Sequence, residues 1–337
     1  MDWYVIISNT LRGGISQSAI IYALAAIGLN LHFGYTGLLN FGQVGFMAAG
    51  AYGLGITTDT YGWPLWAGIV AGLAAGVVLA LLLGAPTLRL RADYLAIVTI
   101  AAGEIIRLTV RAARFSDTTG GSNGINGFAN EFQGWNPFDP SAGYGTRVFG
   151  ELDLRYNGAD LWEHIVGWAL VGVAMLVMWM LVTSPWGRVL KSIREDEDAS
   201  RALGKNVFRF KMQSLILGGT FGAIAGMFFA VSNNSVQPDN YSTPVTFFAL
   251  TAAIIGGLGR VAGPVIGAII FWMILAFTDN VLRQAVGEEY IPRSIMESTQ
   301  VGQVRFMLVG VGLILLLVFR PQGVIGDKRE VAIDVRK

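Results

Sequence analysis

The sequence has no cysteine and little charge. Only 14% of its 337 residues are Asp, Glu, Lys or Arg, against about 25% in soluble domains. The absence of cysteine excludes disulfides and thiolate metal sites. A net charge of +1 argues against a nucleic-acid partner. With 53% hydrophobic residues, the composition indicates a polytopic membrane protein.

Motifs for catalysis are also missing. The chain has no G-x-x-x-x-G-K-[ST] phosphate loop, and its predicted spans contain no paired Asp, Ser–Lys or H-E-x-x-H arrangement of an intramembrane protease. His32 and His164 lie near predicted span ends without carboxylate or cysteine neighbours, so we expect interfacial hydrogen bonding rather than a metal site. No catalytic residue, metal ligand or cofactor site is therefore predicted, and an enzyme is the weakest interpretation.

Apolar segments predict an all-α bundle of about eight or nine membrane spans. The segment 1–14 lacks the basic start of a cleavable signal peptide, so we expect the first span to act as its own insertion signal. The predicted spans are Ser18–His32, Val44–Thr58, Pro64–Leu83, Tyr94–Thr109, His164–Thr183, Met212–Val231, Val245–Leu258, Pro264–Asp279 and Val304–Phe319.

The segment 185–211 is a basic excursion between two apolar runs. Such enrichment marks the cytoplasmic side of a membrane, and counting spans from it places Arg89, Arg91, Arg260 and the basic tail inside as well. Within it, 194–204 predicts a short helix that has acids 195–198 in its first turn and ends at Gly204. Its small apolar face suits a groove on another protein, whereas a solvated loop that only fixes topology is the alternative.

The same count places three arginines, Arg107, Arg111 and Arg114, at the outer end of the fourth span. Pairing of Arg107 or Arg111 with Glu104, or snorkelling to the headgroups, would account for them. The outer loop that follows, 115–163, has two parts. The glycine-rich element at 118–127 either cradles a carboxylate with exposed backbone amides or is an open, flexible tip. The aromatic cap at 128–160 either contacts an extracytoplasmic partner or has no function.

Glycines are placed at regular spacing in several spans. Three G-x-x-x-G series predict close helix packing: Gly68, Gly72 and Gly76; Gly218, Gly222 and Gly226; and Gly259, Gly263 and Gly267. Around 53–64 and 257–264 the pattern Gly-Leu-Gly, then Gly and Pro, then a new span occurs twice. The count gives the two units opposite directions, which predicts an inverted repeat with short broken helices.

Polar side chains within the spans are few. Glu104 is the only carboxylate well inside a predicted span, which disfavours a gradient-driven secondary transporter. Asn30, Asn40 and Gln43 surround a glycine-rich turn at 34–45. They either line a pathway for a zwitterion or satisfy backbone groups freed by helix breaks.

Three stretches resemble the branched-chain amino acid permease family, specifically its LivM-type subunit. They are D-A-S-x-x-x-G at 198–204, which resembles the E-A-A-x-x-x-G coupling motif of ATP-binding-cassette (ABC) importers, and the blocks at 29–52 and 251–267. The element at 118–127 also resembles the family's T-G-G-x-x-G-I sequence.

The resemblance implies a permease subunit that forms the substrate pathway of an ATP-driven importer in the bacterial inner membrane. Its expected partners are a homologous permease, two cytosolic ATPases that bind the ATP, an extracytoplasmic binding protein and the lipid. The alternatives are a urea or amide importer permease and a secondary transporter. Residues 1–337 are expected to form one transmembrane domain, with a coupling loop at 185–211 and a cytoplasmic tail at 321–337. The candidate coupling residues are Glu195, Asp198, Ala199, Ala202, Leu203 and Gly204, and the candidate pathway residues are Asn30, Asn40, Gln43 and Glu104.

Overall fold

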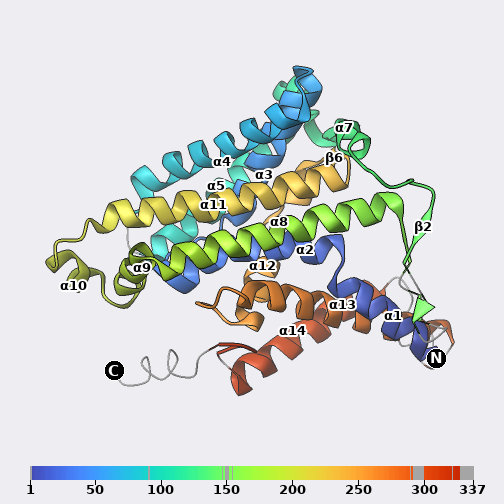
Figure 1. The fold of residues 1–337 in the computed structure, drawn as a ribbon. Coiled ribbons are helices and arrows are strands. Elements are labelled where there is room, and N and C mark those ends of the chain that lie inside the picture. Colours follow the sequence, from blue (N-terminus) through green and yellow to red (C-terminus); the bar gives the residue numbers. More distant parts are fainter. Residues whose placement is uncertain are drawn as a thin grey trace.

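The computed structural model describes most of the chain as one helical bundle (Figure 1). The described residues are 2–89, 92–145, 147–148, 152–153, 155–288, 290, 300–320 and 322–326. The longer helices are α1 (Trp3–Gly14), α2 (Gln17–Leu29), α3 (Gln43–Gly55), α4 (Leu65–Thr87), α5 (Ala92–Arg111), α8 (Gly158–Thr183), α9 (Pro185–Glu195), α11 (Val207–Ser232), α12 (Thr243–Gly256), α13 (Gly263–Gly287) and α14 (Val301–Phe319). The predicted all-α membrane bundle is thus confirmed, with a helix at every predicted span.

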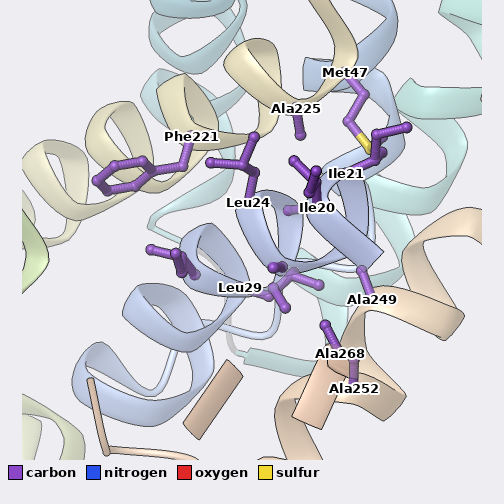
Figure 2. Close-up of a cluster of buried hydrophobic side chains, with 14 of the residues drawn as sticks. Ile20, Ile21, Leu24, Leu29, Met47, Phe221, Ala225, Ala249, Ala252 and Ala268 are labelled. Carbon is purple, nitrogen blue, oxygen red and sulfur yellow. The ribbon is translucent and has the colours of Figure 1, made fainter. Parts of the chain in front are cut away.

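The centre of the bundle is α2, which contacts α8, α11, α12 and α13. This helix is apolar on all sides, and such a helix can only be stable when other helices surround it. Its residues from Ala19 to Leu29 are almost completely buried, apart from Tyr22. Figure 2 shows part of this core, where Leu24 of α2 lies near Phe221 and Ala225 of α11.

Apolar helices on the outside of the bundle expose their side chains. Within the described part of the chain, five helical segments are long and apolar enough to cross a membrane. In α11, 72% of the most apolar stretch is buried, whereas in α8 only 22% is buried. A soluble monomer rarely exposes so much contiguous apolar surface, so the outer faces of α4 and α8 are suited to lipid or to another membrane protein.

Two of the spans are interrupted, as the short apolar segments predict. At 1.5 Å per residue, the 13 residues of α3 and the 14 of α12 each fall short of a bilayer core of about 30 Å. The π-helix η1 (Asn30–Thr36) continues α2, and an irregular segment at 37–42 leads into α3. A second π-helix, η2 (Ile56–Thr60), follows α3.

The two repeat units run in opposite directions. In Figure 1 the turn between α3 and α4 lies at the end of the bundle that carries α7 (Asn130–Gly134), which we call the loop end. The turn between α12 and α13 lies at the opposite end, near α9 and α10 (Glu197–Ala202), which we call the α10 end. This geometry agrees with the predicted inverted repeat.

The last described residues close the turn after α12. The amides of Val324 and Ile325 donate to the carbonyl oxygens of Ile255 (2.8 Å) and Gly256 (3.1 Å). The terminal carbonyls of α12 therefore have partners from beyond α14.

The loop end contains short elements. They are η3 (Ala113–Phe115), α6 (Ser116–Thr119), η4 (Gly121–Asn123), α7, η5 (Pro238–Tyr241) and three antiparallel strand pairs: β1 (Ile125–Asn126) with β6 (Ser235–Val236), β2 (Gly143–Tyr144) with β5 (Tyr156–Asn157), and β3 (Arg147–Val148) with β4 (Leu152–Asp153). The glycine-rich element at 118–127 is folded rather than an open tip. Gly124 has φ +67°, and a Cβ there would overlap the Val236 carbonyl, so this position requires glycine.

Three expectations need correction. The sequence predicted no element before the first span, yet α1 packs along α13, where Asn9 donates to Asn280 at 2.9 Å. In the third glycine series, Gly259 lies in a turn with φ +76° rather than on a helix. Helix α8 begins at Gly158, several residues before the predicted start.

Candidate functional site

The basic excursion folds into two short helices, α9 and α10, that are separated by Asp196. Pro185 occupies the first turn of α9, where its missing N–H is harmless, and α9 buries Leu190 and Ile193 on one face. Asp196 then adopts extended backbone and caps α10 by accepting from the Ala199 amide at 2.9 Å. Glu195 is therefore the last residue of α9 and not part of the first turn of the predicted coupling helix, because the cap falls one residue later.

One face of α10 is tied to the bundle. Ser200 is 1% exposed, and its hydroxyl lies 2.6 Å from that of Ser192 in α9. Glu197 forms an ion pair with Lys211 of α11. These contacts fix the orientation of a helix that is too short to be stable alone.

The opposite face of α10 is open. Asp198, Ala199 and Ala202 are exposed, and Leu203 is 77% exposed. The chain turns at Gly204, whose φ of +78° is the left-handed stop predicted from the sequence. An exposed leucine beside two alanines is a small apolar surface of the kind that enters a groove on a partner.

Helix α9 contacts η1, the π-helix that ends the first span. The Arg194 guanidinium donates to the Gly34 carbonyl, and its side chain covers Gly37, which has φ +72°. One helical turn earlier, the Lys191 ammonium lies 5.5 Å from the centre of the Tyr35 ring. Gly34 and Tyr35 both belong to η1. A displacement of α9 would therefore displace η1, where the first span leaves α-helical geometry.

A buried polar network joins η1 to α3 and α11. It consists of five side chains: His32, Thr36, Asn40, Gln43 and Ser214. The Asn40 amide donates to Nδ1 of His32 and to Oε1 of Gln43, both at 3.1 Å. Since Nδ1 accepts, Nε2 carries the hydrogen that points to the Ser214 carbonyl, 3.2 Å away. His32 is thus a fully buried network member and not an interfacial residue, which corrects the sequence-based expectation.

The network also supports the backbone. Gln43 donates to the Gly218 carbonyl at 2.9 Å, and the Asn40 side chain accepts from the Gly42 amide at 2.9 Å. Thr36 donates to the Leu31 carbonyl at 2.9 Å. The Gly42 amide lies in the irregular segment between η1 and α3, so its bond to Asn40 satisfies a peptide group that the helix break leaves unpaired in an apolar medium.

Asn30, the first residue of η1, connects the first span to the turn that follows α12. Its side chain accepts from the Gly259 amide and donates to the Arg260 carbonyl, both at 2.8 Å. Gly34 approaches this turn so closely that a Cβ would lie 2.5 Å from the Gly259 nitrogen. Of the two interpretations left open, the hydrogen bonds support backbone satisfaction in this conformation, and a pathway role for Asn30, Asn40 and Gln43 stays a prediction.

Glu104 lies apart from this network, toward the loop end of α5. The Nε atom of Arg107 is 3.1 Å from each of its carboxylate oxygens, as one of the sequence alternatives expected. Asp239 of η5, which the sequence analysis did not select, accepts from both Arg107 and Arg111 at 2.9 Å. The sequence contained a hint of this pairing, because the span count places Asp239 on the same side of the membrane as these arginines.

Known proteins similar to this chain are transport permeases. Residues 12–318 match the family described as branched-chain amino acid transport system, permease component. The chain is 31% identical over 326 residues to the high-affinity branched-chain amino acid transport system permease protein LivM of Escherichia coli (strain K12), covering 92% of this chain and 69% of that protein. A probable LivM of Methanocaldococcus jannaschii is 24% identical, with 91% of each chain covered. The LivH permease of the same Escherichia coli strain is 25% identical over 317 residues, covering 90% and 91%. No solved structure gives a significant match.

Proposed function

Because the chain belongs to the family of branched-chain amino acid transport permeases, we propose that it forms part of the substrate pathway of an ATP-driven importer in the bacterial inner membrane. Its partners would be a homologous second permease, two cytosolic ABC ATPases and an extracytoplasmic binding protein. The cargo would be a branched-chain or related amino acid. ATP would be bound by the ATPases, since this chain has no phosphate loop.

The open face of α10 is the observation that carries this proposal. A small apolar surface beside exposed charges, held rigidly by Ser200 and Glu197, is suited to a groove on an ATPase. A solvated loop whose only role is to set the membrane topology would not need the contacts of Ser200 and Glu197 that hold α10 in place. Helix α10 is also connected through α9 to η1. The proposed docking surface is therefore in mechanical contact with the proposed substrate pathway.

Alternating access would follow from this connection. Closure of the ATPases would displace α10 and α9, and Arg194 would pass the displacement to η1. Asn30 would pass it on to the turn between α12 and α13. An irregular segment at η1 that shares hydrogen bonds with the turn after α12 offers two discrete arrangements more readily than continuous helices do.

A gradient-driven secondary transporter is the second candidate. Such a protein uses titratable groups in its core spans, and Glu104, the carboxylate that fits this role best, is held in an ion pair with Arg107. A urea or amide importer permease is the third candidate, and the binding protein would decide between these cargoes.

Reconstitution tests the proposal. The purified chain alone in liposomes should give no concentrative uptake of any amino acid under a proton or sodium gradient. Leucine should accumulate only when the second permease, both ATPases, the binding protein and ATP are present. Gradient-driven accumulation by the lone chain, abolished by Glu104→Gln, would instead establish the secondary transporter.

A further inference from the structure

Four charged side chains gather at the loop end of the bundle, far from the α10 end. We call Glu104, Arg107 and Arg111 of α5 and Asp239 of η5 the outer charge cluster. The three α5 residues fall at i, i+3 and i+7 and so share one face of the helix. Asp239 joins this face to the connection that follows α11, because both arginines donate to its Oδ1 at 2.9 Å.

The cluster is accessible to solvent. The side chains of Asp239 and Arg111 are 64% and 44% exposed, and even Glu104 is 38% exposed. Ion pairs with such exposure contribute little to stability, because water competes with each partner. The Arg107 side chain is only 16% exposed, but the bond between Asp239 and Arg111 can be exchanged for other partners at low cost.

The depth of the cluster indicates what it faces. Glu104 lies two helical turns before Arg111, which ends α5, or roughly 10 Å along the helix axis. A partly exposed carboxylate at this depth would be expensive in hydrocarbon. This face of α5 is therefore turned toward water or toward protein and not toward lipid tails.

A buried hydroxyl next to the cluster lacks a partner. Tyr52 of α3 is 4% exposed, and among the described residues its oxygen has no hydrogen-bond partner. Its ring lies 6.4 Å from that of Tyr241 in η5, two residues after Asp239. A buried hydroxyl that makes no bond in the resting molecule is suited to make one when a ligand arrives.

We propose that the outer charge cluster is a binding site for the charged ends of a free amino acid, occupied in the present conformation by its own ion pairs. The two arginines would take the cargo carboxylate, and Asp239 with Glu104 would take its ammonium group. The inference rests on the proposed function, since it supplies that pathway with an entry site.

Charge balance favours a zwitterion over a neutral solute. The four members carry two positive and two negative charges, so a cargo with one of each can replace the bonds of Asp239 while every charge stays paired. Urea has neither a carboxylate nor an ammonium group and would leave the separated charges without partners. Because only a zwitterion can replace the ion pairs of Asp239 in this way, the cluster favours amino acids over amides such as urea.

Cysteine labelling tests binding directly, without transport. The reporter is Asn240→Cys, next to Asp239 in this cysteine-free chain. In the assembled complex without binding protein, millimolar leucine should slow labelling by a charged thiol reagent at least about threefold. Leucinamide, 4-methylpentanoate and urea should not, because each lacks one or both charges. Equal protection by all four compounds, or by none, would overturn the proposal.

Uptake by the complete complex tests the role of the site in transport. Asp239→Asn, and separately the double variant Arg111→Met with Asp239→Met, should lower leucine uptake about tenfold while ATPase copurification stays unchanged. The double variant leaves the Arg107–Glu104 pair intact and still allows α5 to pack on η5. Asp117→Asn, an exposed acid of α6 at the same end, is the matched control and should transport normally.

The outcomes separate this inference from the function on which it rests. Normal uptake in the double variant would mean that the pairs only fasten α5 to η5, and the inference would be wrong. Absence of ATP-driven uptake in the unaltered complex would refute the proposed function, while the labelling result would still decide whether the cluster binds a zwitterion.

Discussion

Arg194, at the end of α9, donates a hydrogen bond to the carbonyl oxygen of Gly34, a residue 160 positions earlier in the chain. The acceptor lies in η1, where the first span leaves regular α-helical geometry. A charged donor on a peptide carbonyl is among the stronger hydrogen bonds available to a protein. The surface that would receive an ATPase is therefore fastened to an irregular part of the membrane domain.

Replacing Arg194 by alanine should uncouple the importer. We expect the ATPases to copurify as before, because α10 stays in place, whereas ATP-driven uptake falls about tenfold or more. Arg188→Ala, an exposed arginine on the same helix, is the control. Parallel loss of ATPase association and uptake in Arg194→Ala would mean that the residue only stabilises α9.

The apolar part of the open face of α10, formed by Ala199, Ala202 and Leu203, should tolerate no added charge. Ala199→Asp places a carboxylate in a desolvated contact, which typically costs several kcal/mol, and should abolish copurification of the ATPases without affecting membrane insertion. Normal association and uptake would favour the solvated-loop alternative.

Gly204 offers a matched pair at the end of the same helix. With φ at +78°, valine is strained by about 1–2 kcal/mol, whereas asparagine adopts this conformation readily. Gly204→Val should weaken ATPase association and Gly204→Asn should preserve it, as measured by copurification. Equal behaviour of the two variants would exclude backbone conformation as the reason for glycine here.

Asn30→Leu should destabilise the protein. It leaves the Gly259 amide and the Arg260 carbonyl without their side-chain partner, at roughly 1–3 kcal/mol for each group. We expect a clear drop in the thermal midpoint in detergent. If the midpoint stays the same while uptake changes, Asn30 lines the pathway instead of supporting the backbone.

Gly226→Ala should disrupt the packing of α11 on α3. A Cβ at this position would overlap the backbone of Met47, and overpacking of this kind costs about 1–3 kcal/mol or more. Gly172→Ala in α8, where a Cβ meets nothing within 4 Å, is the control and should leave stability unchanged or slightly raised. The two variants can be compared by thermal denaturation in detergent.

Single cysteines test the orientation in the membrane. Ser192 lies in α9, near the α10 end, and Ser122 lies in η4, among the short elements of the loop end; both are exposed. Cysteines at these two positions should be labelled from opposite faces of the membrane by an impermeant reagent. Labelling from the same face would overturn the span count and the cytoplasmic assignment of α10.

Local patterns predicted the spans well because lipid imposes length and polarity on each helix separately. The short α3 and α12 followed from their glycines, as did the left-handed turn at Gly204. Helix α1 was missed because it is amphipathic and its partner, α13, is distant in the sequence. The sequence did not predict that Asp196 is the N-cap of α10. Four acidic residues stand in a row at 195–198, and composition does not indicate which of them caps the helix.

The candidate sites were predictable as residues but not as networks. Asn30, Asn40 and Gln43 stood out as polar groups among apolar neighbours, yet their partners include backbone groups of Gly259, Arg260 and Gly218. Such bonds depend on tertiary contacts between segments about 200 positions apart, where buried peptide groups must find partners. The span count places Asp239 on the same side of the membrane as the arginines, but only the packing of η5 on α5 identifies it as their partner.

The hydrogen bonds of Val324 and Ile325 to the end of α12 set an order of events during synthesis. A ribosome adds roughly 5–20 residues per second, so these amides emerge several seconds after α12 has left the tunnel. During this interval the final carbonyls of a short apolar helix lack their native partners. Water at the membrane surface can hydrate them in the meantime, so the native turn after α12 closes only once α14 and the residues beyond it have been synthesised.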